Sequence, residues 1–186
     1  MAANGSAVVL RTGETVRIRR LTGNDRAPLR RFLEGFGRES LATRFFGAVT
    51  VEAILEPMLD LSDAASRRAL VLTSADGATI LAQAEYLRDR PGSDRAEVAF
   101  LVSEALQGRG CATLLLKALA AEAVAEGIRE FHAEVLADND RMLEVFRDAG
   151  FPYHPHFVAG AIEVRLDLAG PKGVRGSSAP PSAVVA

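Results

Sequence analysis

The residues with the clearest chemical meaning form a glycine-containing loop near the middle of the chain. Glycine lets the backbone approach a ligand closely, and the unpaired N–H groups at the start of a helix attract anions. An apolar run at 98–102 precedes the loop and a helical pattern follows it, so the loop is expected to join a buried strand to a helix. A diphosphate is the natural occupant of such a loop, which reads Gln107-Gly108-Arg109-Gly110-Cys111-Ala112-Thr113.

This loop differs from two common nucleotide-binding loops and resembles a third kind. It lacks the Gly-Lys-Ser/Thr of a Walker loop and the third glycine of a G-x-G-x-x-G dinucleotide loop. It fits Gln/Arg-x-x-Gly-x-Gly/Ala, the pyrophosphate loop of the GNAT superfamily of acyl-CoA N-acyltransferases, which the chain resembles over about residues 7–168. Within that superfamily, three segments resemble the bacterial protein lysine acetyltransferase (Pat-like) branch, namely 16–19 with 25–26, 40–46 and 96–100.

The resemblance implies acetyl-CoA as co-substrate, no metal, and defined roles for backbone groups. The N–H groups from Arg109 to Thr113 would hold the CoA pyrophosphate. Asn139 would touch the CoA chain at a point where two strands splay apart. The strand before the loop would offer backbone groups to the acetyl carbonyl and the pantetheine arm, through Phe100, Leu101 and Val102.

The resemblance also implies a general base. A lysine amine has a pKa near 10.4, so almost all of it is protonated at neutral pH and must lose a proton before it attacks a thioester. Family members often carry a glutamate on the strand that leads to the acetyl site, and Glu97 occupies that position. Such a base contributes about 10²–10⁴-fold in rate. The competing interpretation of Glu97 is a solvated strand glutamate beside Arg95.

One position departs from the family pattern. Many GNAT enzymes carry a tyrosine that protonates the leaving thiolate, and the matching residue here is Phe146, which cannot donate a proton. The thiolate then leaves unprotonated, since the solution pKa of a thiol is only near 8.5, or a water molecule supplies the proton. Tyr153 is a further candidate for this acid.

The hydrophobic pattern predicts the frame that positions these residues. Helical spacing and capping residues predict helices at about 25–36, 40–46, 50–60, 110–126 and 140–149. The strand–helix–strand unit at 95–136 implies a parallel pair, and the resemblance implies an α/β GNAT fold with a mixed, twisted sheet of about seven strands and helices on both faces. We expect one domain at 1–169 and a disordered Gly/Pro/Ser/Ala-rich tail at 170–186. Alternation and turn signals predict strands at 7–10, 15–19, 69–73, 79–87, 95–102, 130–136, 151–156 and 160–168.

Composition narrows the class of protein. The 186 residues are 48% hydrophobic with a net charge of −2, which fits a globular domain and argues against a dedicated nucleic-acid binder. The chain has no long uncharged apolar stretch and no signal-peptide pattern, so we expect a cytoplasmic protein without a membrane span, as a monomer or homodimer. The single cysteine, Cys111, excludes an intramolecular disulfide, and we interpret it as a packing residue rather than an acyl carrier. We expect surface positions on strands, rather than metal binding, for His132, His154 and His156.

The sequence therefore predicts acetyl transfer from acetyl-CoA to a primary amine, by direct attack in a ternary complex, with a protein lysine as the preferred acceptor. Two alternatives stay open. In the first, the acceptor is a small amine or an amino acid, because the segment at about 24–60 that would line the acceptor site is too variable in this superfamily to interpret. In the second, the domain binds acyl-CoA as a sensor without turnover, which Phe146 keeps open.

Overall fold

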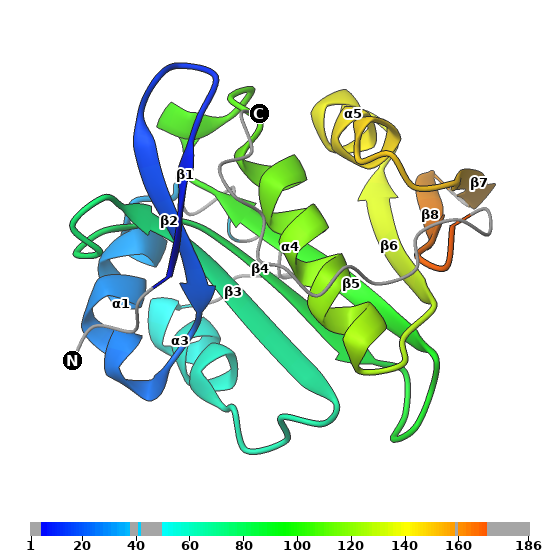
Figure 1. Cartoon of the computed structure of the whole chain (residues 1–186), viewed down its shortest axis with the longest axis horizontal. Coiled ribbons are helices and arrows are strands. Elements are labelled where there is room, and N and C mark those ends of the chain that lie inside the picture. The colour runs from blue at the N-terminus through cyan, green and yellow to red at the C-terminus, as the bar shows by residue number, and fades with distance from the viewer. Residues whose placement is uncertain (1–4, 38–40, 42–49, 159, 171–186) are drawn as a thin grey trace.

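The protein is built around one eight-stranded sheet with the order β1-β2-β3-β4-β5-β6-β8-β7 (Figure 1). The computed structural model describes residues 5–37, 41, 50–158 and 160–170. Neighbouring strands are antiparallel except β5 and β6, which run parallel. The strands are β1 (Ser6–Val9), β2 (Thr15–Arg20), β3 (Arg67–Ser74), β4 (Ile80–Arg88), β5 (Arg95–Val102), β6 (Glu130–Leu136), β7 (Tyr153–Val158) and β8 (Ala161–Asp167).

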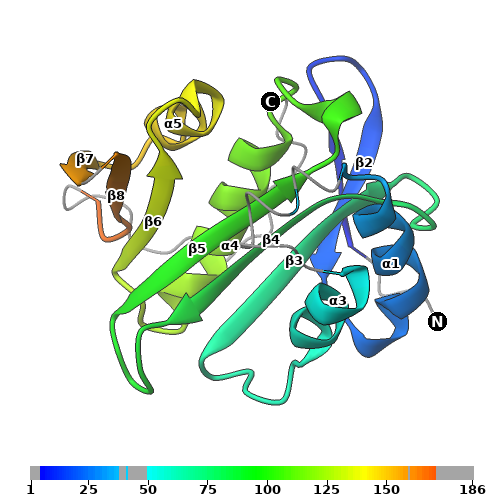
Figure 2. The ribbon, with the colours of Figure 1, turned by 180° about the vertical axis from the view of Figure 1, so that it is seen from behind.

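Helices cover both faces of this sheet, as the two opposite views show (Figures 1 and 2). One face carries α1 (Arg26–Glu34) and α3 (Val51–Leu59), and the other carries α4 (Cys111–Ala125) and α5 (Asp140–Asp148). A separate cluster of buried apolar side chains fills the space under each pair of helices. In the described part of the chain, no helix combines the length and the apolar character needed to cross a membrane.

The predicted fold class is confirmed, and each predicted strand is found with ends that differ by no more than two residues. The expected count of about seven strands is corrected to eight, because both edge strands, β1 and β7, pair into the same sheet. The predicted helix at 40–46 lies outside the described residues, apart from Leu41. The predicted tail likewise lies outside them beyond Gly170, so the division into domain and tail stays a prediction.

The parallel strands β5 and β6 stay together for only part of their length. Their register consists of three pairs, Arg95↔Glu130, Ala96↔Phe131 and Glu97↔His132. Beyond these pairs the two strands diverge, β5 toward the short 3-10 helix η2 (Glu104–Leu106) and β6 toward α5 (Figure 1). From Val98 onward, one edge of β5 therefore has no neighbouring strand among the described residues. This splay is the architectural feature that the candidate site uses.

A buried ion pair fixes the entry into α1. The Asp25 side chain, which closes the 3-10 helix η1 (Gly23–Asp25), is 6% exposed and accepts two hydrogen bonds of 2.7 Å from the Arg19 guanidinium. It also accepts hydrogen bonds from the Thr22 N–H at 2.8 Å and the Thr22 hydroxyl at 2.9 Å. Burial alone raises the pKa of the Asp25 carboxyl, but the hydrogen bonds and the charge of Arg19 outweigh it and hold that pKa below its ordinary value. The pair thereby anchors α1 to β2.

Candidate active site

The glycine loop connects η2 to α4 at the open end of the splay. Gly108 and Gly110 have φ values of 75° and 81°, in the left-handed region that residues with a side chain rarely adopt. A Cβ atom added at either position would meet no atom within 4 Å, so the requirement for glycine is one of backbone conformation and not of space. The two glycines shape the turn that leads directly into the first residue of α4.

The first turn of α4 presents unpaired N–H groups. The first intrahelical hydrogen bond runs from the Leu114 N–H to the Gly110 C=O at 3.0 Å, so the N–H groups of residues 111–113 precede it. The Arg109 N–H instead donates to the Leu106 C=O at 3.3 Å. An internal turn thus already uses the N–H of Arg109, and its contact with a pyrophosphate stays a prediction. An anion at this helix start would be held by Gly110 and the three residues that follow it.

The hydrogen bonds of β5 alternate between its two neighbours. The Ser103 N–H donates to the Leu81 C=O at 3.1 Å, and the Asp89 N–H donates to the Arg95 C=O at 3.2 Å, so the odd-numbered residues of β5 bond to β4. Phe100 and Val102 consequently direct their N–H and C=O groups toward the open side of the splay. Leu101 faces β4 instead, and its side chain, 8% exposed, packs in the core under α1 and α3. The backbone groups of Leu101 thus face β4, unlike those of its two neighbours, and its expected role toward the donor stays a prediction.

Glu97 lies at the point where the splay begins. It is the last β5 residue in register with β6, and its side chain is exposed. Arg95, the neighbour that the competing interpretation invoked, contacts other carboxylates: its Nε lies 2.8 Å from Glu130 and 4.0 Å from Asp89. No hydrogen bond or ion pair joins the Glu97 carboxylate to another described residue. Its carboxylate is therefore free to accept a proton.

A second carboxylate on the same strand pair is already engaged. The Glu85 Oε2 lies 2.5 Å from the Arg67 Nη2 and accepts a hydrogen bond from the Gln83 amide at 3.2 Å. Because Glu85 is held by these two donors, it is a weaker candidate for a base than Glu97.

Asn139 is the N-cap of α5. Its Oδ1 accepts a hydrogen bond from the Met142 N–H at 3.1 Å, which is the usual capping contact. The capping role leaves the Asn139 amide N–H2 for a ligand in the splay. The sequence assigned Asn139 only to the CoA chain, although an asparagine just before a helical pattern is itself a capping signal.

Phe146 closes the splay from the α5 side. It is 1% exposed, and its ring meets the ring of Phe100 edge-on, with centroids 6.0 Å apart and an interplanar angle of 74°. The position at which many family members carry an acidic tyrosine hydroxyl is thus a packing position in this chain. Tyr86 is fully buried, so Tyr153, half-buried on β7, is the more accessible of the two tyrosines.

Two side-chain contacts at the loop were not foreseen from the sequence. Arg141 of α5 donates to the Gln107 Oε1 at 2.8 Å, which links the two diverging arms across the open end of the splay. Arg109 lies 3.9 Å from Glu14 of the β1–β2 turn. Both contacts join residues far apart in the sequence, so no local sequence pattern predicts them.

Cys111, the first residue of α4, is 1% exposed. Burial raises the pKa of its thiol, and the negative charge of Glu14 adds to this, whereas Arg109 acts in the opposite direction. A high pKa and a closed environment both oppose a nucleophilic role. These features support a packing role for Cys111 and disfavour an acyl-cysteine.

We expect Cys111 to resist labelling in the folded protein. At neutral pH, Ellman's reagent should titrate almost no thiol in the native chain and one thiol per chain in denaturant, since Cys111 is the only cysteine. Cys111→Ala provides the blank. Rapid labelling of the native protein would contradict the packing assignment.

The comparisons with known proteins agree with this geometry. The acetyltransferase (GNAT) family model matches residues 38–151. The acetyltransferase Pat of Mycolicibacterium smegmatis is 33% identical over 165 residues, which amount to 87% of this chain and 45% of that protein. The chain thus spans less than half the length of that relative.

Solved structures share the fold. The crystal structure of the GNAT domain of S. lividans PAT matches with a TM-score of 0.76 at 36% identity, over 88% of this chain and 96% of that one. A putative acetyltransferase from Salmonella typhimurium, solved with its cofactor acetyl-CoA, matches with a TM-score of 0.65 over 88% of this chain and 99% of that one. Its 17% identity shows the common fold alone. The chain therefore belongs to the acetyltransferase (GNAT) family, which confirms the family predicted from the sequence.

Proposed function

We propose that this domain transfers the acetyl group of acetyl-CoA to the side-chain amine of a protein lysine, with Glu97 as general base. The observation that carries the proposal is the position of Glu97. Its exposed carboxylate, which forms no ion pair or hydrogen bond with a described residue, lies on the last β5 residue joined to β6, and the open backbone edge of β5 begins at the next residue. A base at this point adjoins the groove that would hold the acyl chain of the donor.

The donor would bind through backbone groups. The pyrophosphate would occupy the start of α4, where the N–H groups from Gly110 to Thr113 have no backbone acceptor among the described residues. The pantetheine arm would run along the open edge of β5, accepting from and donating to Phe100 and Val102, with the Asn139 amide on the opposite arm. A β5 N–H that meets the thioester carbonyl would stabilise the negative charge that develops on its oxygen.

The chemical step needs a neutral amine. Glu97 would accept the proton of the lysine ammonium, directly or through a water molecule, and the amine nitrogen would attack the thioester carbonyl carbon. The C–N bond forms, the C–S bond breaks and CoA leaves as a thiolate, while the former amine nitrogen releases its second proton to water to give the amide. Because Phe146 has no proton to give, the thiolate would take its proton from water after leaving, in keeping with a thiol pKa near 8.5.

The choice of acceptor rests on relatives. The domain is 33% identical to an acetyltransferase named Pat and 36% identical to the GNAT domain of a second PAT. The sequence points the same way, since three segments of this chain resemble the Pat-like branch, whose acceptors are protein lysines. These likenesses support a protein lysine over a small amine.

The test is an acceptor screen read by mass spectrometry. The purified chain is incubated with acetyl-CoA and, separately, with lysine peptides, intact proteins, free amino acids and polyamines, and each acceptor is examined for one added acetyl group. Acetylated lysine side chains are expected. Acetylation confined to small amines would overturn the lysine assignment. Binding of acetyl-CoA without any acetylated acceptor would favour the sensor alternative.

A substitution at Gly110 should weaken donor binding. Gly110→Ala places a side chain at φ 81°, which costs about 1–2 kcal/mol and is relieved only by moving the N–H groups at the start of α4. We expect the Kd for acetyl-CoA, measured by calorimetry, to rise about 5- to 30-fold. Gly92→Ala is the matched control, since Gly92 has φ 77° in the β4–β5 turn at the far end of β5. Equal affinity of the two variants would argue against this loop as the donor site.

A further inference from the structure

Part of the sheet on the α1 and α3 side carries carboxylates next to Glu97. Among the described helices, α1 and α3 cover the β3 and β4 region on that side, and none covers β6, β8 or β7 (Figure 2). Alternate residues of β6 and β8, such as Ala133 and Val164, are buried in the core under α4 and α5. The residues between them therefore point to the uncovered side, and Glu134 and Glu163 are among these.

Two of these carboxylates lie directly opposite each other. Glu134 of β6 and Glu163 of β8 are register partners in an antiparallel pair. Like charges in that arrangement destabilise a sheet. Glu163 has a partial partner in Arg165, whose Nε lies 3.1 Å from its Oε1, whereas the exposed Glu134 forms no ion pair with a described residue. Of these two opposed carboxylates, Glu134 therefore has no positively charged partner among the described residues.

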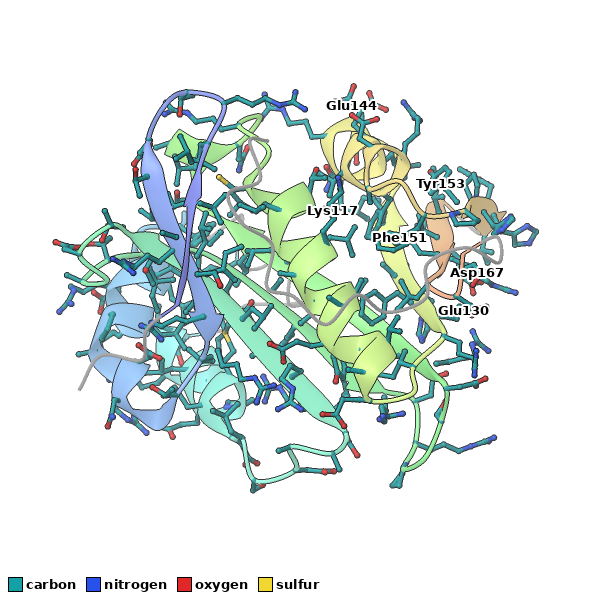
Figure 3. All side chains as sticks on the ribbon, in the orientation of Figure 1. Lys117, Glu130, Glu144, Phe151, Tyr153 and Asp167 are labelled. Atoms are coloured by element: carbon teal, nitrogen blue, oxygen red, sulfur yellow. The ribbon has the colours of Figure 1, made fainter. Side chains whose placement is uncertain are left out.

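Two other basic side chains on this part of the sheet, Arg95 and His132, already contact carboxylates, and His156 of β7 lies opposite Glu163 in the strand register. Arg95 contacts Glu130 and Asp89, and the His132 Nε2 lies 2.7 Å from the Asp89 Oδ1. Glu130 itself faces Asp167 across the β6–β8 pair, at the end of the strands remote from the splay (Figure 3). The carboxylates left without a cation near the splay are thus Glu97 and Glu134.

The spacing between these two carboxylates matches a short stretch of peptide. Glu97 is in register with His132, and Glu134 lies two residues further along β6, a rise of about 6.6 Å. An extended peptide advances about 3.3–3.6 Å per residue. A lysine whose amine reaches Glu97 would therefore carry a residue about two or three positions away within reach of Glu134.

We propose that Glu134, backed by Glu163, selects acceptor segments that carry an arginine or lysine two or three positions from the acetylated lysine. The inference rests on the proposed function, since it needs a peptide acceptor at Glu97. It assigns the uncovered face of β6 and β8 to a basic segment of the acceptor protein. The repulsion between the opposed Glu134 and Glu163 carboxylates is then offset by the positive charge of that segment when it binds.

The test compares three peptides that share one acceptor lysine. The residues two and three positions away on each side are all arginine in the first peptide, all glutamine in the second and all glutamate in the third. Each is assayed with the wild-type chain, with Glu134→Gln, with Glu134→Lys and with Glu144→Gln. The last is the matched control: an exposed glutamate of α5 without an ion pair among the described residues, on the other side of the sheet (Figure 3). The KM for acetyl-CoA is measured in parallel and should not change.

We expect the wild-type chain and Glu144→Gln to favour the arginine peptide over the glutamine peptide by about 2- to 5-fold in kcat/KM at low salt. Glu134→Gln should remove the preference and Glu134→Lys should invert it toward the glutamate peptide, while the glutamine peptide is used equally by all four proteins. Removing the opposed charge should also raise the melting temperature of Glu134→Gln. Equal use of all peptides by the wild type, or a preference that survives Glu134→Lys, would overturn the inference alone. Failure of every peptide to be acetylated would overturn the proposed function and this inference together.

Discussion

Replacing Glu97 by glutamine should lower kcat about 10²–10⁴-fold and leave the Kd for acetyl-CoA unchanged, because a general base acts on the acceptor proton and not on the donor. Glutamine keeps the size and hydrogen-bonding atoms of the side chain but cannot take up a proton. The exposed Glu97 carboxylate has no described partner to lose, so the fold should tolerate the change. Single-turnover kinetics with saturating acetyl-CoA measures the effect, and calorimetry measures donor binding.

The pH profile separates a lost base from a distorted site. Raising the pH increases the fraction of acceptor amine that is already neutral, since the lysine pKa is near 10.4. The deficit of Glu97→Gln should therefore shrink as the pH rises toward that value. Glu85→Gln serves as the comparison on the neighbouring strand, where the carboxylate is held by Arg67. A Glu97→Gln protein that keeps wild-type kcat at neutral pH would exclude Glu97 as the base.

Replacing Asp25 by alanine should destabilise the fold by about 3–5 kcal/mol, because it leaves the buried Arg19 guanidinium without its counter-ion. The wild-type carboxylate is 6% exposed and accepts hydrogen bonds from both Arg19 and Thr22. Urea denaturation gives the free energy of unfolding. Glu56→Ala is the matched control, because Glu56 also forms a bidentate ion pair with an arginine, Arg26 of α1, but on the exposed surface. That variant should unfold at nearly the wild-type urea concentration.

The contribution of Asp25 should also depend on pH with a definite sign. Its pKa is depressed in the folded state, so the stability it adds is present above the unfolded pKa of about 3.9 and is lost as the pH falls through the lower folded pKa. The difference in unfolding free energy between the wild type and Asp25→Ala should therefore be constant near neutral pH and narrow below about pH 4. A difference that stays the same in acid would mean that the ion pair does not carry the effect.

Local signals in the sequence were sufficient for the elements and their ends. The helix predicted at about 50–60 corresponds to α3, which begins where the Thr50 hydroxyl accepts a hydrogen bond from the Ala53 N–H at 3.2 Å. The helix predicted at about 140–149 corresponds to α5, which is followed by Gly150 with a φ of 84°. The strand–helix–strand unit at 95–136 correctly predicted that β5 and β6 run parallel. In the first two cases the determining contacts lie within a few residues, and in the third the order of the elements is sufficient.

Features that depend on register between distant segments could not be predicted. The pairing of β5 with β4 determines which backbone groups of β5 point into the splay, and it separates Leu101 from Phe100 and Val102. The Arg141–Gln107 and Phe100–Phe146 contacts arise only once α5 is packed beside β5. The Arg109 N–H donates a hydrogen bond within a turn, and no sequence pattern specifies that bond. The motif therefore identifies a candidate segment, and the strand pairing determines which of its backbone groups face the splay.

The alternation along β5 has a consequence for how this domain can evolve. The donor contacts proposed for the N–H and C=O groups of Phe100 and Val102 would not depend on which side chains those positions carry. Substitutions at these two positions are restricted by side-chain packing. The surface near Glu134 and Glu163, in contrast, can change its charge without disturbing the groove proposed for the donor. Substitutions on that one side of the sheet can therefore change the acceptor of such a domain while its donor stays the same.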